Sequence, residues 1–146
     1  MVDAERAPGA PGELNRDVLA RMRRITQLHT SLWQERVPEL TKPQYGVVRA
    51  LADAPSGLSQ AAVGERVAMD KATLAQLIPR LEARGLVVRA VAPEDRRRRV
   101  LKLTPEGART VRDLSPRVEA LDEETLSPLP PSDRHTLQRL LTDLAE

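Results

Sequence analysis

The sequence contains no cysteine, and this absence excludes several kinds of site. Without thiols the chain can form no disulfide, no thiolate zinc site and no thiol redox switch, so a cysteine-based peroxide sensor is ruled out. Two histidines, His29 and His135, leave little to bind a transition metal. We therefore expect neither a metal site nor a cofactor.

Aromatic residues are almost as scarce, since the chain has no Phe, one Trp and one Tyr. Its core must be built from Leu, Val, Ile and Ala, which suits helices. No apolar run approaches the roughly 20 residues of a membrane span, and the first residues resemble neither a signal peptide nor an anchor. The length fits one domain, or one domain with appended helices, and we expect a cytoplasmic protein that contacts no membrane.

The formal net charge is only +2, but the charges are unevenly distributed. Residues 59–104 hold ten Lys or Arg and five Asp or Glu, which gives +5. The rest of the chain holds thirteen basic and sixteen acidic residues, which gives −3. A basic middle between mildly acidic flanks indicates that binding to a polyanion is localised there.

Capping signals and breaks in the pattern predict the order of the elements. Residues 1–12 have the Ala, Pro and Gly content of a disordered arm, and apolar residues recur at helical spacing from about 13 to 37. Further helices are expected after five capping residues, of which the first forms a capping box with Gln44: Thr41, Ser59, Asp70, Thr104 and Ser132. Two internal prolines should disturb their helices, Pro79 by a kink and Pro116 by an interruption and a bend.

The middle of the chain has the order of a winged helix-turn-helix, with two short capped helices and then a hairpin. In the second helix Leu74, Leu77, Ile78 and Leu81 form the inward stripe, and a different set of side chains points outward. The outward set has the chemistry of major-groove contacts to bases and phosphates: Lys71, Thr73, Gln76 and Arg80. The alternative for this set is a solvated helix face of mixed polarity.

An arginine cluster stands between two β-prone runs, 86–91 and 100–104, at or beside the expected hairpin tip. Four adjacent guanidinium groups repel one another unless an anionic polymer neutralises them. A solvated loop is the alternative for the cluster by itself. The preceding helices favour a nucleic-acid contact.

Four segments then carry a resemblance to the MarR (multiple antibiotic resistance regulator) family of bacterial transcription factors. They are Leu58-Ser59-Gln60, the run from Arg80 to Arg89, Asp95-Arg96-Arg97 and Leu103-Thr104-Pro105-Glu106-Gly107, and their order and separation match. The resemblance covers about residues 14–146. It implies a mainly α fold with a small β-hairpin wing, in which a winged helix-turn-helix is flanked by N- and C-terminal dimerisation helices.

The resemblance also implies a homodimer whose recognition helices (70–84) enter the major groove of a palindromic operator and whose wings (92–99) enter the minor groove. The family's Asp-x-Arg motif falls on Asp95 and Arg97, so Asp95 would hold the loop and orient the guanidinium that enters the groove. Arg96, Arg98 and Arg99 are then phosphate candidates. Ser59 and Gln60, where the first short helix starts, complete the DNA-binding candidates.

The domain plan follows as an arm (1–12), N-terminal dimerisation and effector helices (13–53), the DNA-binding region (54–104) and C-terminal dimerisation helices (105–146). One-sided Leu and Val stripes in both terminal regions lack a partner inside a winged-helix core and favour a second copy. Packing within one subunit is the alternative.

Family members commonly bind small anionic aromatic ligands between these parts, and the ligand weakens DNA binding. The candidates in this chain are His29, Trp33 and Tyr45, with Arg49 as a carboxylate partner, although single aromatics at helical spacing often belong to the core. The urate-responsive subgroup has a Trp-Asp pair where this chain has Gln44-Tyr45-Gly46, so urate is not expected.

The expected function is therefore a ligand-responsive DNA-binding repressor. An RNA- or ribosome-associated winged-helix protein without ligand sensing is the alternative, because the arginine cluster would serve it as well. An enzyme is not expected, since the chain has no glycine-rich phosphate loop and no spacing of a nucleophile and a base.

Overall fold

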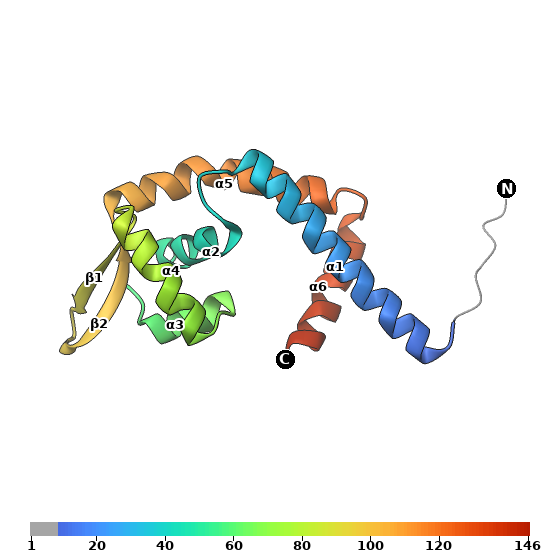
Figure 1. Cartoon of the computed structure of the whole chain (residues 1–146), viewed down its shortest axis with the longest axis horizontal. Helices are drawn as coiled ribbons and strands as arrows, with labels where there is room; N and C mark the ends of the chain where they lie inside the picture. Colours follow the sequence, from blue (N-terminus) through green and yellow to red (C-terminus); the bar gives the residue numbers. More distant parts are fainter. Residues whose placement is uncertain (1–8) are drawn as a thin grey trace.

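The computed structural model describes residues 9–146 and consists of six helices and one β-hairpin. Figure 1 shows α5 running along one side of the molecule, from the hairpin to the region of α1 and α6. The elements in chain order are α1 (Pro11–Arg36), α2 (Lys42–Ala52), α3 (Gln60–Val67), α4 (Lys71–Ala83), β1 (Val87–Ala92), β2 (Asp95–Leu103), α5 (Pro105–Leu126) and α6 (Pro131–Ala145).

Four of the five predicted helix caps are confirmed. The Thr41 and Gln44 side chains form a complete capping box, and the Ser59, Asp70 and Thr104 side chains each accept a backbone N–H of the first turn. The cap predicted at Ser132 is wrong, because α6 begins at Pro131 and Pro130 occupies the cap position. Pro130 has no side-chain oxygen to accept an N–H group of the first turn, so this helix starts without a side-chain cap.

The N-terminal helix is longer than expected. It begins at Pro11, so Pro11 and Gly12 are helical and the predicted arm 1–12 is too long at its end. The remainder of that prediction, residues 1–8, lies outside the described residues. Proline at the first position again explains the early start, because its fixed φ suits a helix.

The hairpin differs from the prediction in one respect. Its turn is Pro93-Glu94, and the arginine cluster lies within β2 rather than in a loop. The register pairs Val91 with Arg99 and Ala92 with Asp95, so residues 96–98 have no partner on β1. This bulge projects three arginines from the strand. Leu58 forms a bridge to Leu101 on the other side of β2.

One aliphatic core joins the helices to the hairpin, and it contains the single Trp. Its fully buried members come from α2, α3, α4, β2, α5 and the segment between α1 and α2: Leu51, Leu74, Ile78, Leu81, Leu101, Leu114, Leu121, Val37, Val47, Val48, Val63 and Val100. Gly107 lets the start of α5 approach the segment between α4 and β1, since a Cβ there would lie 2.2 Å from the Leu86 carbonyl oxygen.

Both internal prolines lie inside continuous helices. The helix α4 runs through Pro79 to Ala83, and α5 runs through Pro116 to Leu126, so the predicted interruption at Pro116 is wrong. Next to Pro116, the Ser115 hydroxyl donates to the Val111 carbonyl oxygen at 2.7 Å. Packing of Leu114 and Val118 on the core holds both sides of this helix in place.

Candidate nucleic-acid interface

The helix α4 divides its side chains between the core and solvent as predicted. Leu74, Ile78 and Leu81 are buried, and Leu77 is half-buried against the core. All four side chains predicted to point outward are exposed: Lys71, Thr73, Gln76 and Arg80. The outward row therefore lies on one accessible helix, whose width suits the major groove of duplex DNA.

Asp70 fixes the start of this helix. Its carboxylate accepts the backbone N–H of Thr73 at 2.7 Å and the Thr73 hydroxyl at 2.9 Å. These bonds lower the pKa of Asp70, with the backbone N–H as the larger cause. Because the Thr73 hydroxyl is engaged in the cap, the methyl group of Thr73 is the part left for a base.

The start of α3 is tied to the hairpin. Ser59 caps α3 by accepting the Ala62 backbone N–H at 3.1 Å. The Arg89 guanidinium on β1 donates to the Gln60 side chain at 3.3 Å and to Glu82 of α4 at 3.1 Å. Arg89 was not among the predicted site residues, and it links both short helices to the wing.

Within the bulge of β2 the arginines have different partners. The Asp95 carboxylate accepts the backbone N–H of Arg97 at 2.9 Å, so it holds the loop but contacts the backbone rather than the guanidinium that it was predicted to orient. Arg98 pairs with Glu94 at 2.8 Å. Within residues 9–146, Arg96, Arg97 and Arg99 form no ion pair, and all three are exposed.

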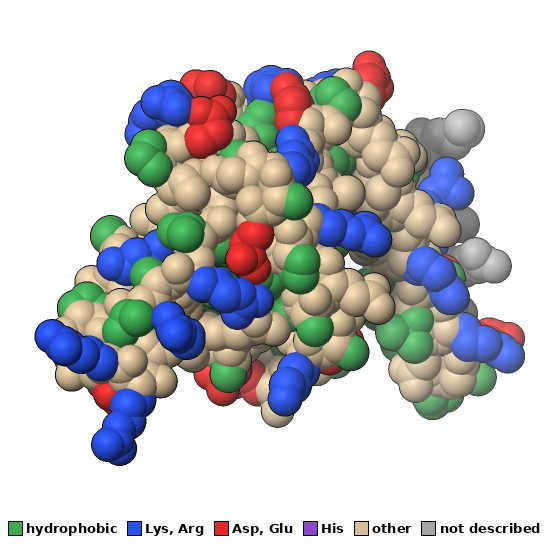
Figure 2. All heavy atoms as spheres, turned by 60° about the vertical axis from the view of Figure 1, so that its left-hand side comes forward, with side chains coloured by type: hydrophobic (Ala, Val, Ile, Leu, Met, Phe, Trp, Pro, Cys, Tyr) green, Lys and Arg blue, Asp and Glu red, His purple; other side chains and the backbone are tan. Residues whose placement is uncertain are grey.

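Exposed cations therefore lie on both elements that project from this end of the molecule. Figure 2 turns this end toward the viewer and shows Lys and Arg side chains spread over it, with few acidic side chains among them at the tip. The described residues contain no group of three His, Cys, Asp or Glu side chains suited to a metal. The geometry fits a polyanion that contacts α4 and the hairpin together.

The aromatic candidates for an effector site form a row among α1, α2 and α5. The ring of Trp33 lies 6.1 Å from His29 and 5.4 Å from Tyr45, measured between centroids. Trp33 is buried, and its indole N–H donates to the Leu40 carbonyl oxygen at 2.7 Å. His29 faces Asp122 of α5 at 2.8 Å. The structure thus brings the three rings together, with Trp33 inside the core.

Arg49 lines a hollow between α2 and α5. Tyr45 and Arg49 both reach the Ser115 hydroxyl oxygen, at 3.2 and 3.4 Å. Arg112 also lines the hollow, together with apolar groups that include Leu51 and Val111. Arg112 and Ser115 were not predicted, because they flank the buried stripe of α5 and nothing in the sequence connects them to Arg49.

Comparisons with known proteins agree with this architecture. A family model described as MarR family matches residues 39–98. The transcriptional regulator HosA of Escherichia coli is 42% identical over 120 residues, which cover 82% of this chain and 88% of HosA. The chain belongs to the MarR family. This MarR-family protein is a winged-helix transcriptional regulator with a DNA-binding function.

Two solved structures resemble most or nearly all of this chain. PcaV of Streptomyces coelicolor, solved with its natural ligand, is 38% identical with a TM-score of 0.77, over 99% of this chain and 96% of PcaV. BpsR of Bordetella bronchiseptica, whose DNA binding is regulated by 6-hydroxynicotinic acid, is 32% identical with a TM-score of 0.79, over 89% and 99% of the two chains. The predicted family and fold class are both confirmed.

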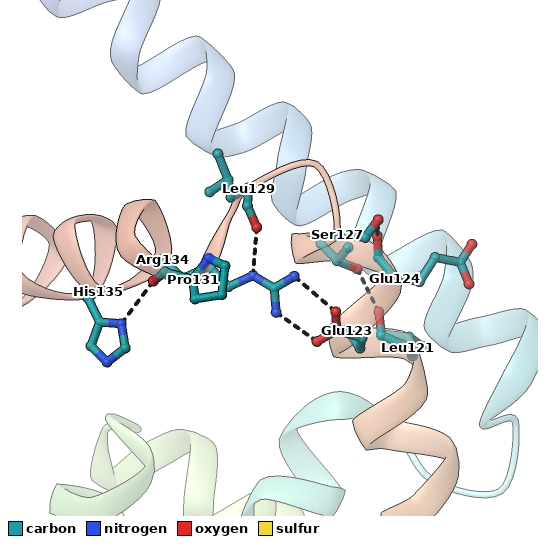
Figure 3. A network of polar contacts seen from close by, with 9 residues as sticks. Leu121, Glu123, Glu124, Ser127, Leu129, Pro131, Arg134 and His135 are labelled. Atoms are coloured by element: carbon teal, nitrogen blue, oxygen red, sulfur yellow. Dashed lines mark hydrogen bonds and ion pairs between the residues drawn. The ribbon is translucent and has the colours of Figure 1, made fainter.

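In this MarR-family chain, three consecutive acids on α5 hold the terminal helices. Asp122 contacts His29, Glu124 pairs with Arg36 of α1, and Glu123 binds Arg134 of α6. Figure 3 shows the Arg134 guanidinium between Glu123 and the Leu129 carbonyl oxygen, at 2.7, 2.9 and 2.9 Å. Hydrogen bonds from the guanidinium groups lower the pKa of Glu123 and of Glu124.

Proposed function

We propose that this protein is a homodimeric repressor that binds a palindromic operator and is released by a small aromatic or anionic ligand. The observation that carries the proposal is the placement of the outward row of α4 and the arginine bulge of β2 at one end of the molecule. With α4 in the major groove, the bulge would reach the adjacent minor groove, where narrow A·T tracts attract arginine. Such a regulator works in the cytoplasm, with the DNA.

The opposite end of the molecule supports a dimer. The helix α6 has no buried residue, and large apolar side chains on α1 and α6 are exposed. They are Leu14, Val18, Leu19, Met22, Ile25, Leu28, Leu140, Leu141 and Leu144. None of the helices formed by residues 9–146 is long and apolar enough to span a membrane. A second copy is the simplest cover for these faces, and twofold symmetry would place the recognition helices about 34 Å apart.

A ligand site in the hollow between α2 and α5 has chemical support. Arg112 and Arg49, which also pairs with Asp53 at 3.4 Å, bring two guanidinium groups to a hollow with apolar side chains in its wall. Two cations beside apolar groups suit an aromatic carboxylate. Both similar structures come from proteins described with a small ligand. Tyr45 reaches Ser115 at the wall of this hollow, and the Trp33 ring packs on Tyr45, so the aromatic row would sense an occupant through these contacts.

Selection from a random duplex library with the full chain tests the DNA-binding part. We expect a palindromic site that is bound by two protomers, with an affinity that falls as salt rises because Lys and Arg displace counterions. Double-stranded RNA should compete poorly, since its deep narrow groove does not admit a helix. Equal competition by RNA would favour the RNA-associated alternative and contradict the proposal.

Thermal-shift screening tests the ligand part, with phenolic acids and 6-hydroxynicotinic acid as probes. A probe that stabilises the wild type should shift the melting temperature of Arg49→Gln less, because the carboxylate loses a partner. Arg109→Gln is the matched control, since Arg109 pairs with Glu106 inside α5. Trp33→Ala tests whether the aromatic row contributes. Identical shifts in the wild type and in both site variants would contradict the proposed site.

A further inference from the structure

The segment that connects α1 to α2, residues 37–41, is held by side chains from three directions. Val37 and Leu40 are buried in the core. The Leu40 carbonyl oxygen accepts the Trp33 indole N–H from α1 at 2.7 Å. The other two contacts are made by Glu39, whose side chain is exposed to solvent. This short segment is therefore fixed although it has no regular secondary structure of its own.

The first contact to Glu39 comes from Arg117 of α5. The Arg117 guanidinium donates to both carboxylate oxygens of Glu39, at 2.6 and 3.3 Å, and to the Arg36 carbonyl oxygen at 2.9 Å. That carbonyl belongs to the last turn of α1, where acceptors lack helical partners and a cation is favoured. Arg117 lowers the pKa of Glu39 by its hydrogen bond, which agrees with a maintained contact.

The second contact to Glu39 comes from the end of the recognition helix, α4. Arg84, the C-cap residue of α4, donates to the Glu39 carbonyl oxygen at 2.8 Å. Across residues 9–146 this is the one hydrogen bond that joins α4 or its C-cap to the chain before α2. Glu39 therefore contacts two elements: its backbone carbonyl accepts from the C-cap of α4, and its carboxylate accepts from α5.

These contacts are poorly suited to stabilising the fold. The side chains of Arg117 and Glu39 are 43% and 42% exposed, and ion pairs with such exposure contribute little to the free energy of unfolding. The contacts instead restrict geometry. The two hydrogen bonds from Arg117 to the Glu39 carboxylate, and the one from Arg84 to the Glu39 carbonyl oxygen, fix how α5 and the end of α4 are oriented relative to this segment. The helix α4 otherwise packs on α3 and β1, which belong to the same DNA-binding end.

We propose that Arg84, Glu39 and Arg117 form a joint that sets the position of the recognition helix relative to α5, and so determines the half-site spacing that the dimer accepts. They are positioning residues, since none lies in the outward row of α4 or in the arginine bulge. This proposal rests on the homodimeric, palindrome-binding function proposed above. A rigid joint on each protomer makes the distance between two recognition helices a fixed quantity rather than a variable one.

The test uses a palindromic duplex selected with the wild-type protein and a second duplex with one base pair inserted between its half-sites. The measured quantity is the dissociation constant for the duplex with the insertion divided by that for the selected duplex. Residues that couple distant parts of a protein contribute about 0.5–2 kcal/mol, so Arg84→Gln and Arg117→Gln should each reduce this ratio by about 2- to 30-fold. Their affinity for an unrelated duplex should stay at the wild-type value, because no base or phosphate contact is removed.

Two controls separate positioning from charge and from folding. Arg109→Gln removes one exposed cation whose partner lies in the same helix, and it should leave the ratio unchanged. Arg84→Lys keeps a donor and should recover part of the discrimination. Wild-type ratios in both Arg84→Gln and Arg117→Gln would overturn the joint while leaving the proposed function intact. Failure of the wild type to select any palindrome would overturn both.

Discussion

Arg97 and Arg98 are neighbours in β2, but their surroundings differ. The backbone of Arg97 is fixed by the Asp95 carboxylate while its guanidinium stays unpaired within the described chain, and Arg98 is held by Glu94. An unpaired guanidinium is better suited to enter a minor groove, because no ion pair has to break before it binds DNA. The structure thus gives Arg97 and Arg98, to which the family resemblance assigns different roles, different surroundings.

Arg97→Ala should therefore weaken operator binding by about 1–3 kcal/mol, and by more than Arg98→Ala or Arg99→Ala. The physical reason is the loss of one specific groove contact rather than of one charge among four. Fluorescence anisotropy at fixed salt measures the three dissociation constants. Equal losses in all three variants would show that the cluster acts only as an electrostatic surface.

At the scale of the element, the recognition helix contains a residue that is unfavourable for a helix. Pro79 is exposed and has no N–H to donate to the Ala75 carbonyl oxygen, yet α4 continues to Ala83. Burial of Ile78 and Leu81 on either side of it holds the helix against this cost. Tertiary packing therefore outweighs local propensity here.

Pro79→Ala should raise the free energy of unfolding by about 1–3 kcal/mol, because it restores a backbone hydrogen bond and removes a steric clash. Urea denaturation measures the change. Pro105→Ala provides the control, since Pro105 occupies the first helical position of α5, where no N–H is required. Loss of a proline also makes the unfolded chain more flexible, which lowers stability, so Pro105→Ala should show no gain. A gain of the same size in Pro105→Ala would contradict the restored hydrogen bond as the cause.

At the scale of the whole molecule, carboxylates with lowered pKa values join the terminal helices. Glu123 and Glu124 bind Arg134 and Arg36. A carboxylate whose pKa is lowered by folding contributes stability above its unfolded pKa of about 4.3 and loses that contribution as pH falls through the folded value. Acid should therefore loosen the contacts of α1 and α6 with α5.

Urea midpoints measured from pH 6 to pH 3 should fall for the wild type, mainly below about pH 4.5. Glu123→Gln should lie lower at pH 6 and fall less steeply, because one titrating contact is gone. Glu119→Gln is the comparison, since Glu119 is exposed and has no ion pair within residues 9–146. Parallel curves for Glu123→Gln and the wild type would contradict this account.

Local sequence signals predicted most of the secondary structure and the inward and outward sides of its helices. Thr41, Ser59, Asp70 and Thr104 were identified as caps because a short side-chain oxygen before an apolar period has few other roles. The inward and outward sides of α4 followed from the helical period alone. The start of α6 was misplaced by two residues, because Pro130 and not Ser132 is the cap and Pro131 already occupies the first helical position.

Contacts between distant residues could not be predicted in this way. Glu39 lies 78 positions from Arg117 and 45 from Arg84, and nothing in the order of residues connects them. The same holds for Arg49, Arg112 and Ser115 around the hollow between α2 and α5. Pairing of exposed charges depends on how helices cross, which is decided by packing of the core.

By itself the sequence determined the order of the elements, the aliphatic core and the basic middle, because capping, periodicity and charge are local properties. The absence of cysteine likewise settled at once which chemistry was excluded. Only the tertiary structure decided that residues 96–98 form a strand bulge and that, within residues 9–146, Arg98 is the one arginine of the cluster with an ion pair. It also decided that Glu39 joins α4 to α5. These features depend on distances between elements, and such distances exist only once the core has packed.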